Sequence, residues 1–209
     1  ADSMGCYGQR LDVTPNLDRL SREGVKFEHA MTPQPVCGPA RSCLQTGRYA
    51  SETGCFINRR PLKENELTIA KELKKSGYET AYVGKWHLAS DHHANELYID
   101  RPIPQHRRGG YDDYVAMVDV LEFTSHGYDG YVFDKDGNKM EFTGYRPDCL
   151  TDYAISYLHK KTSDKPFFLF ISYIEPHQQN DTNLCEGPDG SKRKFKDYDI
   201  PQDLLVGEY

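Results

Sequence analysis

Apolar and polar side chains along the chain follow two periods in turn, which predicts helices that alternate with strands. Residues 14–24 begin with Thr-Pro, place Leu17 and Leu20 on one face and end at Gly24, the pattern of a capped helix. Residues 25–31 then alternate apolar and polar side chains, as a half-buried strand does. The pattern therefore predicts a helix followed directly by a strand.

The same order recurs in residues 66–88. A short helix is predicted there, with Gly77 as its end, and a strand follows through Val83. Three apolar side chains are expected on the inner face of this helix: Leu67, Ala70 and Leu73. Lys85 and His87 stand in the polar segment that follows the strand.

A longer helix and a buried strand are predicted over residues 148–173. Behind a capping Asp148, apolar side chains recur at helical spacing: Leu150, Tyr153, Ala154, Tyr157 and Leu158. Residues 166–173 form a near-continuous apolar run, which predicts a strand buried on both faces. His177 follows this strand in the next loop.

The long segment 89–147 is rich in Gly, Asp, Tyr and Pro. Within it, residues 131–142 predict a hairpin closed by an Asp-Gly turn. We expect the segment as a whole to be an irregular excursion rather than part of the core.

Alternating helices and strands predict the fold class, an α/β domain with a mainly parallel (mixed) sheet sandwiched by helices. A chain of 209 residues with 37% hydrophobic residues is long enough for one sizeable domain, which we expect to span residues 1–209. In this architecture ligands bind beyond the carboxyl ends of the strands. Polar residues that directly follow a predicted strand are therefore the candidates for a functional site.

Composition and charge exclude several classes of function. A formal net charge of −6 argues against a general nucleic-acid surface, whose mark is a clustered basic face. No apolar run approaches the roughly 18 residues that a membrane span needs, so none is predicted. The six cysteines have no C-x-x-C spacing, which gives a structural zinc site little support. If the substrate is an anion, its positive partners must be local.

The stretch PVCGPARSCLQTGR, residues 35–48, predicts such a local anion site. Pro39 suits the first turn of a helix, and Gly47 suits its end. Cys37 then stands at or just before the first turn, where unpaired backbone amides and the helix dipole attract anions. Arg41 is four residues on, so its guanidinium returns to the site over one turn.

Two further segments bring polar side chains to the same edge of the predicted sheet. Lys85 and His87 are two residues apart in a segment expected to be extended, which points both to one side and Trp86 to the other. His177 follows the strand predicted at 166–173. Cations and proton carriers around one anion suit transfer of a sulfuryl or phosphoryl group.

These residues carry a resemblance to a known family. CGPARSCLQTGR, residues 37–48, resembles the first signature of the type I sulfatases, and GYETAYVGKWHL, residues 77–88, is similar to their second signature. Four shorter elements also fall in the order that the family shows: GCYG, TPNLDRL, EGVKFEHA and EPH. The resemblance covers most of residues 1–88, resumes around 147–180, and implies the alkaline-phosphatase-like fold of the sulfatases.

The resemblance implies a mechanism for hydrolysis of a sulfate monoester. Cys37 would be oxidised by a formylglycine-generating enzyme to an aldehyde, whose hydrate attacks sulfur and later collapses to expel sulfate. Arg41 would hold the hydrate, Lys85 would neutralise sulfate oxygens, and His87 would bind the hydrate and assist its collapse. His177 would protonate or hydrogen-bond the leaving oxygen. The implied substrate is a small-molecule or saccharide sulfate ester.

The family also binds a divalent cation, usually calcium, through carboxylates and the hydrate at position 37. The family's first acidic pair precedes the GCYG element, and its second lies beyond the EPH region. Neither pair is found in this sequence. We therefore expect an incomplete catalytic domain whose acidic metal ligands lie outside the chain.

Two other functions remain open at this point. The same fold and aldehyde would serve a phosphonate or phosphate ester hydrolase, because tetrahedral oxyanions have similar sizes. A non-catalytic anion-binding relative, in which Cys37 is never oxidised, is the third possibility.

Several neighbouring polar residues have simpler interpretations than catalysis or metal binding. Asp112 and Asp113 are expected in a solvated turn, and residues 91–93, Asp-His-His, in a polar loop. Arg48 is expected to support the active-site helix through hydrogen bonds, and Cys43 to pack in the core.

Overall fold

The computed structural model describes residues 3–179 and 182–197. Within it the chain divides into two compact units, one before and one after the boundary between Thr32 and Pro33. In the part of the chain that the structure describes, each helix is too short or too polar to cross a membrane.

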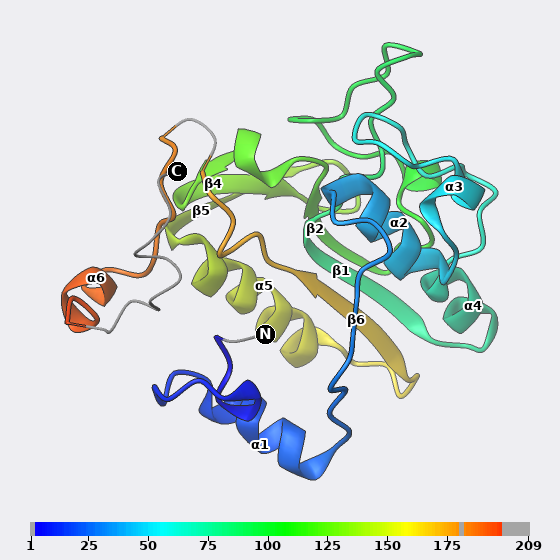
Figure 1. Cartoon of the computed structure of the whole chain (residues 1–209). Coiled ribbons are helices and arrows are strands. Elements are labelled where there is room, and N and C mark those ends of the chain that lie inside the picture. The colour runs from blue at the N-terminus through cyan, green and yellow to red at the C-terminus, as the bar shows by residue number, and fades with distance from the viewer. Residues whose placement is uncertain (1–2, 180–181, 198–209) are drawn as a thin grey trace. The chain divides into compact units, whose positions relative to one another are not determined.

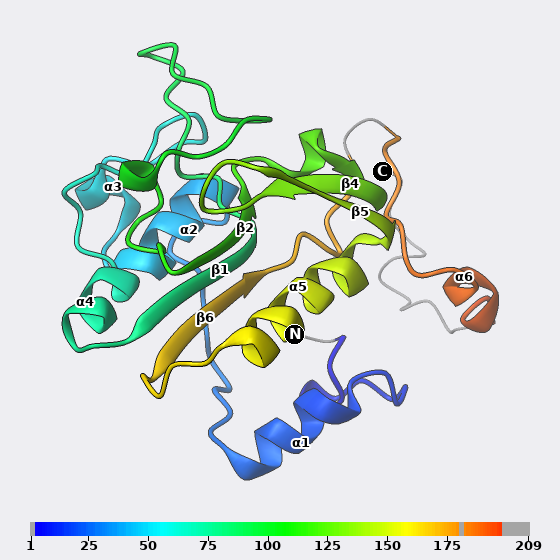
Figure 2. The ribbon, with the colours of Figure 1, turned by 180° about the vertical axis from the view of Figure 1, so that it is seen from behind.

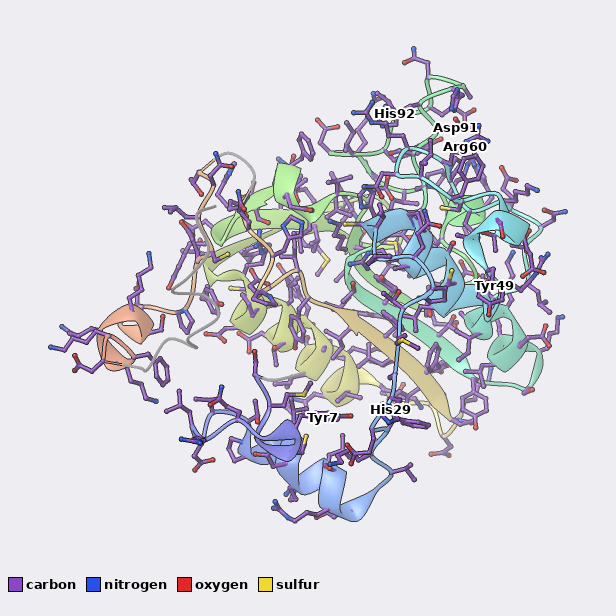
Figure 3. All side chains as sticks on the ribbon, in the orientation of Figure 1. Tyr7, His29, Tyr49, Arg60, Asp91 and His92 are labelled. Carbon is purple, nitrogen blue, oxygen red and sulfur yellow. The ribbon has the colours of Figure 1, made fainter. Side chains whose placement is uncertain are left out.

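The first unit contains one of the predicted helices but not the predicted strand. Helix α1, Pro15–Glu23, begins after Thr14 and ends before Gly24, as expected. The short 3-10 helix η1, Gly5–Tyr7, is held to it because the amide of Cys6 donates to Oδ1 of Asp18 at 2.6 Å. The hydroxyl of Tyr7, seen in this unit in Figure 3, donates to the carbonyl of Phe27 at 2.8 Å.

Leu17 and Leu20 of α1 are 48% and 64% exposed. One expectation for this unit is wrong, because residues 25–31 are not a strand in the described structure. An alternating pattern states which side chains share a face, but a strand forms only where a neighbour completes the backbone hydrogen bonds.

The second unit is built on a mixed sheet with six strands among the described residues, in the order β3-β4-β2-β1-β6, with β5 paired to β4. The parallel strands are β1, Glu79–Lys85, β2, Tyr114–Val118, and β6, Phe167–Ser172. The antiparallel ones are β3, Ser125–His126, β4, Tyr128–Phe133, and β5, Lys139–Tyr145. The mixed sheet and its helices match the predicted fold class.

Helices pack on both faces of this sheet (Figures 1 and 2). On one side of β1 lie α2, Cys37–Thr46, α3, Ala50–Thr53, and α4, Ile69–Lys75. On the other lies the longest helix of the described part, α5, Arg146–Lys160. Three short helical segments lie in the connections: η2, Gln105–Arg107, η3, Leu121–Phe123, and α6, Ser191–Lys194.

The period of two along β1 divides its side chains between two cores. Tyr82 packs with Trp86 and with Ala70 of α4 in the first core, and Val83 packs with Leu150 of α5 in the second. The sheet is thus buried on both faces along its central strand, as a parallel sheet requires.

The segment 89–147 is only partly an excursion. The hairpin predicted at 131–142 is confirmed, since β4 and β5 pair around it. The expectation that the segment lies outside the core is wrong for β2, which pairs with β1 and is buried from Val115 to Val118. Strand β2 is only five residues long and directly follows residues rich in Gly, Asp and Tyr, which are typical of turns. The segment was therefore interpreted as irregular.

The two helices predicted from apolar periodicity are present with small differences. In α4, Ala70 is buried, but Leu67 is 52% exposed because the helix begins after it. In α5 the cap is Tyr145 rather than Asp148, and Leu158 is 44% exposed.

Strand β6 is present where it was predicted, but it is not buried on both faces. Phe167 is 44% exposed and Ile171 is 36% exposed. Within the described residues β6 ends the sheet order and pairs with β1 alone.

Candidate active site

Position 37 lies at the amino-terminal end of a helix, as predicted. Cys37 is the first residue of α2 and is partly buried, with a free thiol. Val36, before it, provides no side-chain cap. The capping acceptor comes from another segment, because Oδ1 of Asn58 accepts the amide of Gly38 at 2.8 Å. The first turn of α2 is therefore fixed from outside the helix.

Arg41 joins α2 to the ends of two parallel strands. Its Nη1 donates to the carbonyl oxygen of Lys85 at 2.8 Å and to Oγ of Ser172 at 2.6 Å. Lys85 ends β1 and Ser172 ends β6. The guanidinium thus stands at the carboxyl edge of the sheet, where the sequence predicted the site.

Close contact between these strand ends requires a glycine. Gly84 pairs in register with Ser172 and has a φ of 103°. A Cβ at this position would lie 2.1 Å from the carbonyl oxygen of Ser172. Only glycine combines this backbone conformation with such a short approach.

The ammonium group of Lys85 is buried and ion-paired. The residue is 1% exposed, and its Nζ donates to Oε1 of Glu122, which lies in η3 and is 8% exposed. Burial by itself raises the pKa of Glu122, but the charge and hydrogen bond of Lys85 outweigh it and leave that pKa below its ordinary value. A bound anion would therefore share Lys85 with this carboxylate.

His87 belongs to the same electrostatic cluster but does not lie in an extended segment. Its φ is 62°, in the left-handed region, so the predicted geometry is wrong at this residue. Burial, followed by the charge of Lys85, lowers its pKa from 6.5 to about 4. At neutral pH the imidazole is therefore uncharged, and its Nδ1 is buried without a hydrogen-bond partner among the described residues.

Asp119 supports the loop that holds His87. It is fully buried, and its two carboxylate oxygens accept the amides of Ala89 and Ser90 at 2.9 and 3.0 Å. Its charge also opposes the lowering of the His87 pKa. The loop after β1 is thus tied to the loop after β2.

His177 stands on the loop after β6, as predicted, and its side chain is exposed. Its amide donates to the carbonyl of Ile174 at 2.9 Å, and its Nδ1 lies 2.5 Å from the carbonyl oxygen of Gln178. Among the described residues, no hydrogen bond or ion pair joins His177 to Arg41 or to Lys85. Its role stays a prediction.

The neighbouring acidic residues have structural partners. Asp112 pairs with Lys74 at 2.6 Å, and Oδ2 of Asp113 accepts the amide of Thr80 at 2.7 Å. Arg48 pairs with Glu66 at 2.8 Å beyond the end of α2.

The segment 91–93 forms a turn of its own beside residues 59–60. Oδ1 of Asp91 accepts the amides of His93 and Ala94, and the amide of His92 donates to the carbonyl of Arg59. Figure 3 shows Asp91 and His92 near Arg60.

A metal site is not formed by the described residues alone. No group of three or more His, Cys, Asp or Glu side chains among residues 3–179 and 182–197 could hold a metal ion. The carboxylates closest to the cluster, Asp119 and Glu122, are already engaged with backbone amides and with Lys85. The described residues therefore do not by themselves fit a calcium site.

Three residues of the cluster were not predicted from the sequence. Asn58 lies in a loop and Glu122 in the short 3-10 helix η3. Neither carries a local signal, because only tertiary packing brings them to α2 and to β1. Ser172 could have been found, since it ends a predicted strand parallel to the one that ends at Lys85.

Fold and site together define a class of protein. It is an α/β domain in which a helix amino terminus, an arginine, a lysine and a histidine gather beyond the carboxyl ends of parallel strands. This is where such domains bind ligands.

Comparison with known proteins identifies the family. The family model described as Sulfatase matches residues 1–204. An ulvan-active sulfatase of Formosa agariphila is 36% identical over 207 residues, which cover 98% of this chain and 37% of that protein. An N-acetylglucosamine-6-O-sulfatase of Bacteroides thetaiotaomicron is 33% identical over 176 residues, covering 84% of this chain and 28% of that protein. The chain belongs to the sulfatase family.

Solved structures agree with this assignment. The YidJ protein of Bacteroides fragilis superposes with a TM-score of 0.81 at 26% identity, over 99% of this chain and 47% of that one. A protein solved with its substrate D-glucosamine-2-N,6-O-disulfate superposes with a TM-score of 0.75 at 27% identity, over 96% of this chain and 36% of that one. The chain spans about a third of the length of the curated relatives just named.

Proposed function

We propose that this chain forms part of a sulfatase that hydrolyses a sulfate monoester at position 37. The observation that carries the proposal is the placement of Cys37 on the first turn of α2, one turn before an arginine fixed to the ends of β1 and β6. Family membership supports it. Formylglycine made from Cys37 would supply a hydrated aldehyde as the nucleophile.

The chain's own residues would bind the sulfate and stabilise its charge. In the first turn of α2 the amide of Gly38 is bonded to Asn58 and that of Ala40 to the carbonyl of Val36. The helix dipole and the guanidinium of Arg41 would therefore attract an anion at position 37. Lys85 adds a positive charge in a buried setting, where electrostatic interactions are stronger than in water. Because Glu122 already neutralises part of that charge, the site favours a singly charged sulfate ester over a doubly charged phosphate monoester.

The two histidines would have different tasks. His87 is neutral at pH 7 and offers an unpaired, buried nitrogen, so it suits accepting a proton from a hydroxyl at position 37. His177 is exposed on the loop after β6 and would serve the leaving oxygen. When Nδ1 of His177 donates to the carbonyl of Gln178, Nε2 is the nitrogen that can carry the transferable proton.

We further propose that the substrate is a sulfated saccharide. Two of the relatives support this, since one is named an N-acetylglucosamine-6-O-sulfatase and another was solved with a glucosamine disulfate. A formylglycine-generating enzyme would be the maturation partner, because oxidation of a thiol to an aldehyde needs its own catalyst.

The test combines mass spectrometry with turnover. The protein is produced with and without a formylglycine-generating enzyme, and the peptide that contains position 37 is weighed. We expect conversion of Cys37 and, with it, cleavage of 4-nitrophenyl sulfate. Cys37→Ala should abolish turnover with folding intact, and Cys43→Ala, which removes a buried thiol on the same helix, should retain it.

Two results would overturn the proposal. An unmodified thiol at position 37 in protein from a competent host would favour a non-catalytic anion-binding relative. Faster cleavage of an aryl phosphonate ester than of the matching aryl sulfate would assign the site to phosphonate chemistry instead.

A further inference from the structure

A buried arginine contacts the loop of His177 on both sides of that residue. Arg146 is the first residue of α5 and is 2% exposed. Its Nε donates to Oε1 of Glu175 at 2.8 Å, and its Nη2 lies 2.6 Å from the same oxygen. Its Nη1 donates to Oε1 of Gln179 at 3.3 Å. Glu175 and Gln179 stand two residues before and two residues after His177.

The same network attaches this loop to the sheet. Nη1 of Arg146 donates to Oγ of Ser125 at 3.0 Å, and Nε2 of Gln179 donates to the carbonyl of Ser125 at 3.0 Å. Nε2 of Gln179 also lies 3.4 Å from the carbonyl oxygen of Glu122, whose carboxylate pairs with Lys85. The His177 loop and the lysine of the cluster therefore share one support.

The position of Arg146 is not explained by its own helix. A cation in the first turn of a helix opposes the helix dipole, and burial of a guanidinium costs free energy unless its donors are paired. The donors of Arg146 are paired with groups of the His177 loop and of β3. Arginine suits this task because its planar fork can bind several acceptors in fixed directions, which an ammonium group does not.

We propose that Arg146 is a positioning residue for His177: it holds Glu175 and Gln179 so that the exposed imidazole between them faces the leaving group. The inference rests on the proposed function. In the step concerned, the oxygen nucleophile at position 37 forms a bond to sulfur while the S–O bond of the ester breaks. The electron pair of the broken bond stays on the leaving oxygen, and the imidazolium of His177 gives its Nε2 proton to that oxygen. The imidazole is left neutral.

The leaving group provides the test, because an acid catalyst matters most where the departing oxygen is basic. kcat/KM is measured for 4-nitrophenyl sulfate, whose leaving group is stable as an anion, and for phenyl sulfate, whose leaving group is not. His177→Ala should lose far more activity on phenyl sulfate than on 4-nitrophenyl sulfate. Arg146→Met should show the same selective loss, by about tenfold or more, and Arg146→Lys should recover part of it.

Arg108 offers a matched control. It is also buried, 6% exposed, and its Nε donates to the carbonyl of Ile103 at 2.7 Å. Within the described residues, no hydrogen bond or ion pair joins it to the His177 loop. Arg108→Met should lower stability without changing the ratio of the two kcat/KM values. If Arg146→Met does not fold, Glu175→Gln removes the charge of its partner at constant shape and should give the selective loss in milder form.

The outcomes separate the two proposals. If His177→Ala is selective but neither Arg146→Lys nor Glu175→Gln changes the ratio, the positioning role is wrong and the function stands. If His177→Ala itself loses both activities equally, the acid role of His177 is wrong, and the inference about Arg146 fails with it. A wild-type ratio in Arg146→Met also overturns the inference.

Discussion

His87 should make the stability of the folded protein depend on pH. Its pKa is lowered from 6.5 to about 4, by burial first and then by the charge of Lys85. In the unfolded chain both causes vanish and the pKa returns to its ordinary value. Between these two values the unfolded state binds a proton that the folded state does not. The contribution of neutral, buried His87 is therefore complete above about pH 6.5 and is lost as the pH falls through about 4.

The size of this effect follows from the two pKa values. Each pKa unit corresponds to about 1.4 kcal/mol, so the protein should lose about 2 kcal/mol by about pH 5 and about 3 kcal/mol by about pH 4 through this residue alone. Since folded domains are stable by only about 5–15 kcal/mol, such a loss is readily measured.

The assay is urea unfolding of the wild type and of His87→Gln at about pH 7.5 and about pH 5. Carboxylates contribute to the pH dependence of both proteins, and the difference between the two isolates His87. We expect the wild type to lose about 2 kcal/mol more than the variant. His92→Gln, which changes an exposed histidine on the following loop, serves as the control and should behave as the wild type does. Parallel losses in the wild type and His87→Gln would refute the reasoning.

The remaining predictions concern the edge of the sheet. Lys85→Ala should lower kcat/KM for an aryl sulfate by about 100-fold or more and leave Glu122 buried without its cation. Arg48→Ala should cost only a few fold, because Arg48 pairs with Glu66 and stands beyond the end of α2 that is opposite to position 37. Equal losses in the two variants would contradict the role of Lys85. Gly84→Ala should destabilise the fold by about 1–3 kcal/mol or more, because the added Cβ would lie 2.1 Å from a backbone carbonyl oxygen. The measurement is the midpoint of urea unfolding, which should fall. An unchanged midpoint would show that β1 and β6 can separate at this position.

Local sequence patterns predicted correctly the elements that have a long regular period of apolar residues or a clear turn sequence. Helix α5 and the β4–β5 hairpin were found because their apolar and turn residues follow a regular period over many positions. The prediction of a strand at 25–31 was wrong, because alternation of apolar and polar side chains does not by itself provide a neighbouring strand to pair with. Strand β2 has a pairing partner but was not predicted. Its five residues are too few to show a period within a segment rich in turn residues.

The sequence by itself determined the family, the helix that begins at Cys37, and the presence of cations beyond the strands. Only the tertiary structure decided what each of these groups binds. Arg41 and Ser172 are 131 residues apart and meet at 2.6 Å, and Lys85 pairs with a carboxylate 37 residues away. Such contacts depend on how strands and loops pack in three dimensions, and no local period along the chain records them.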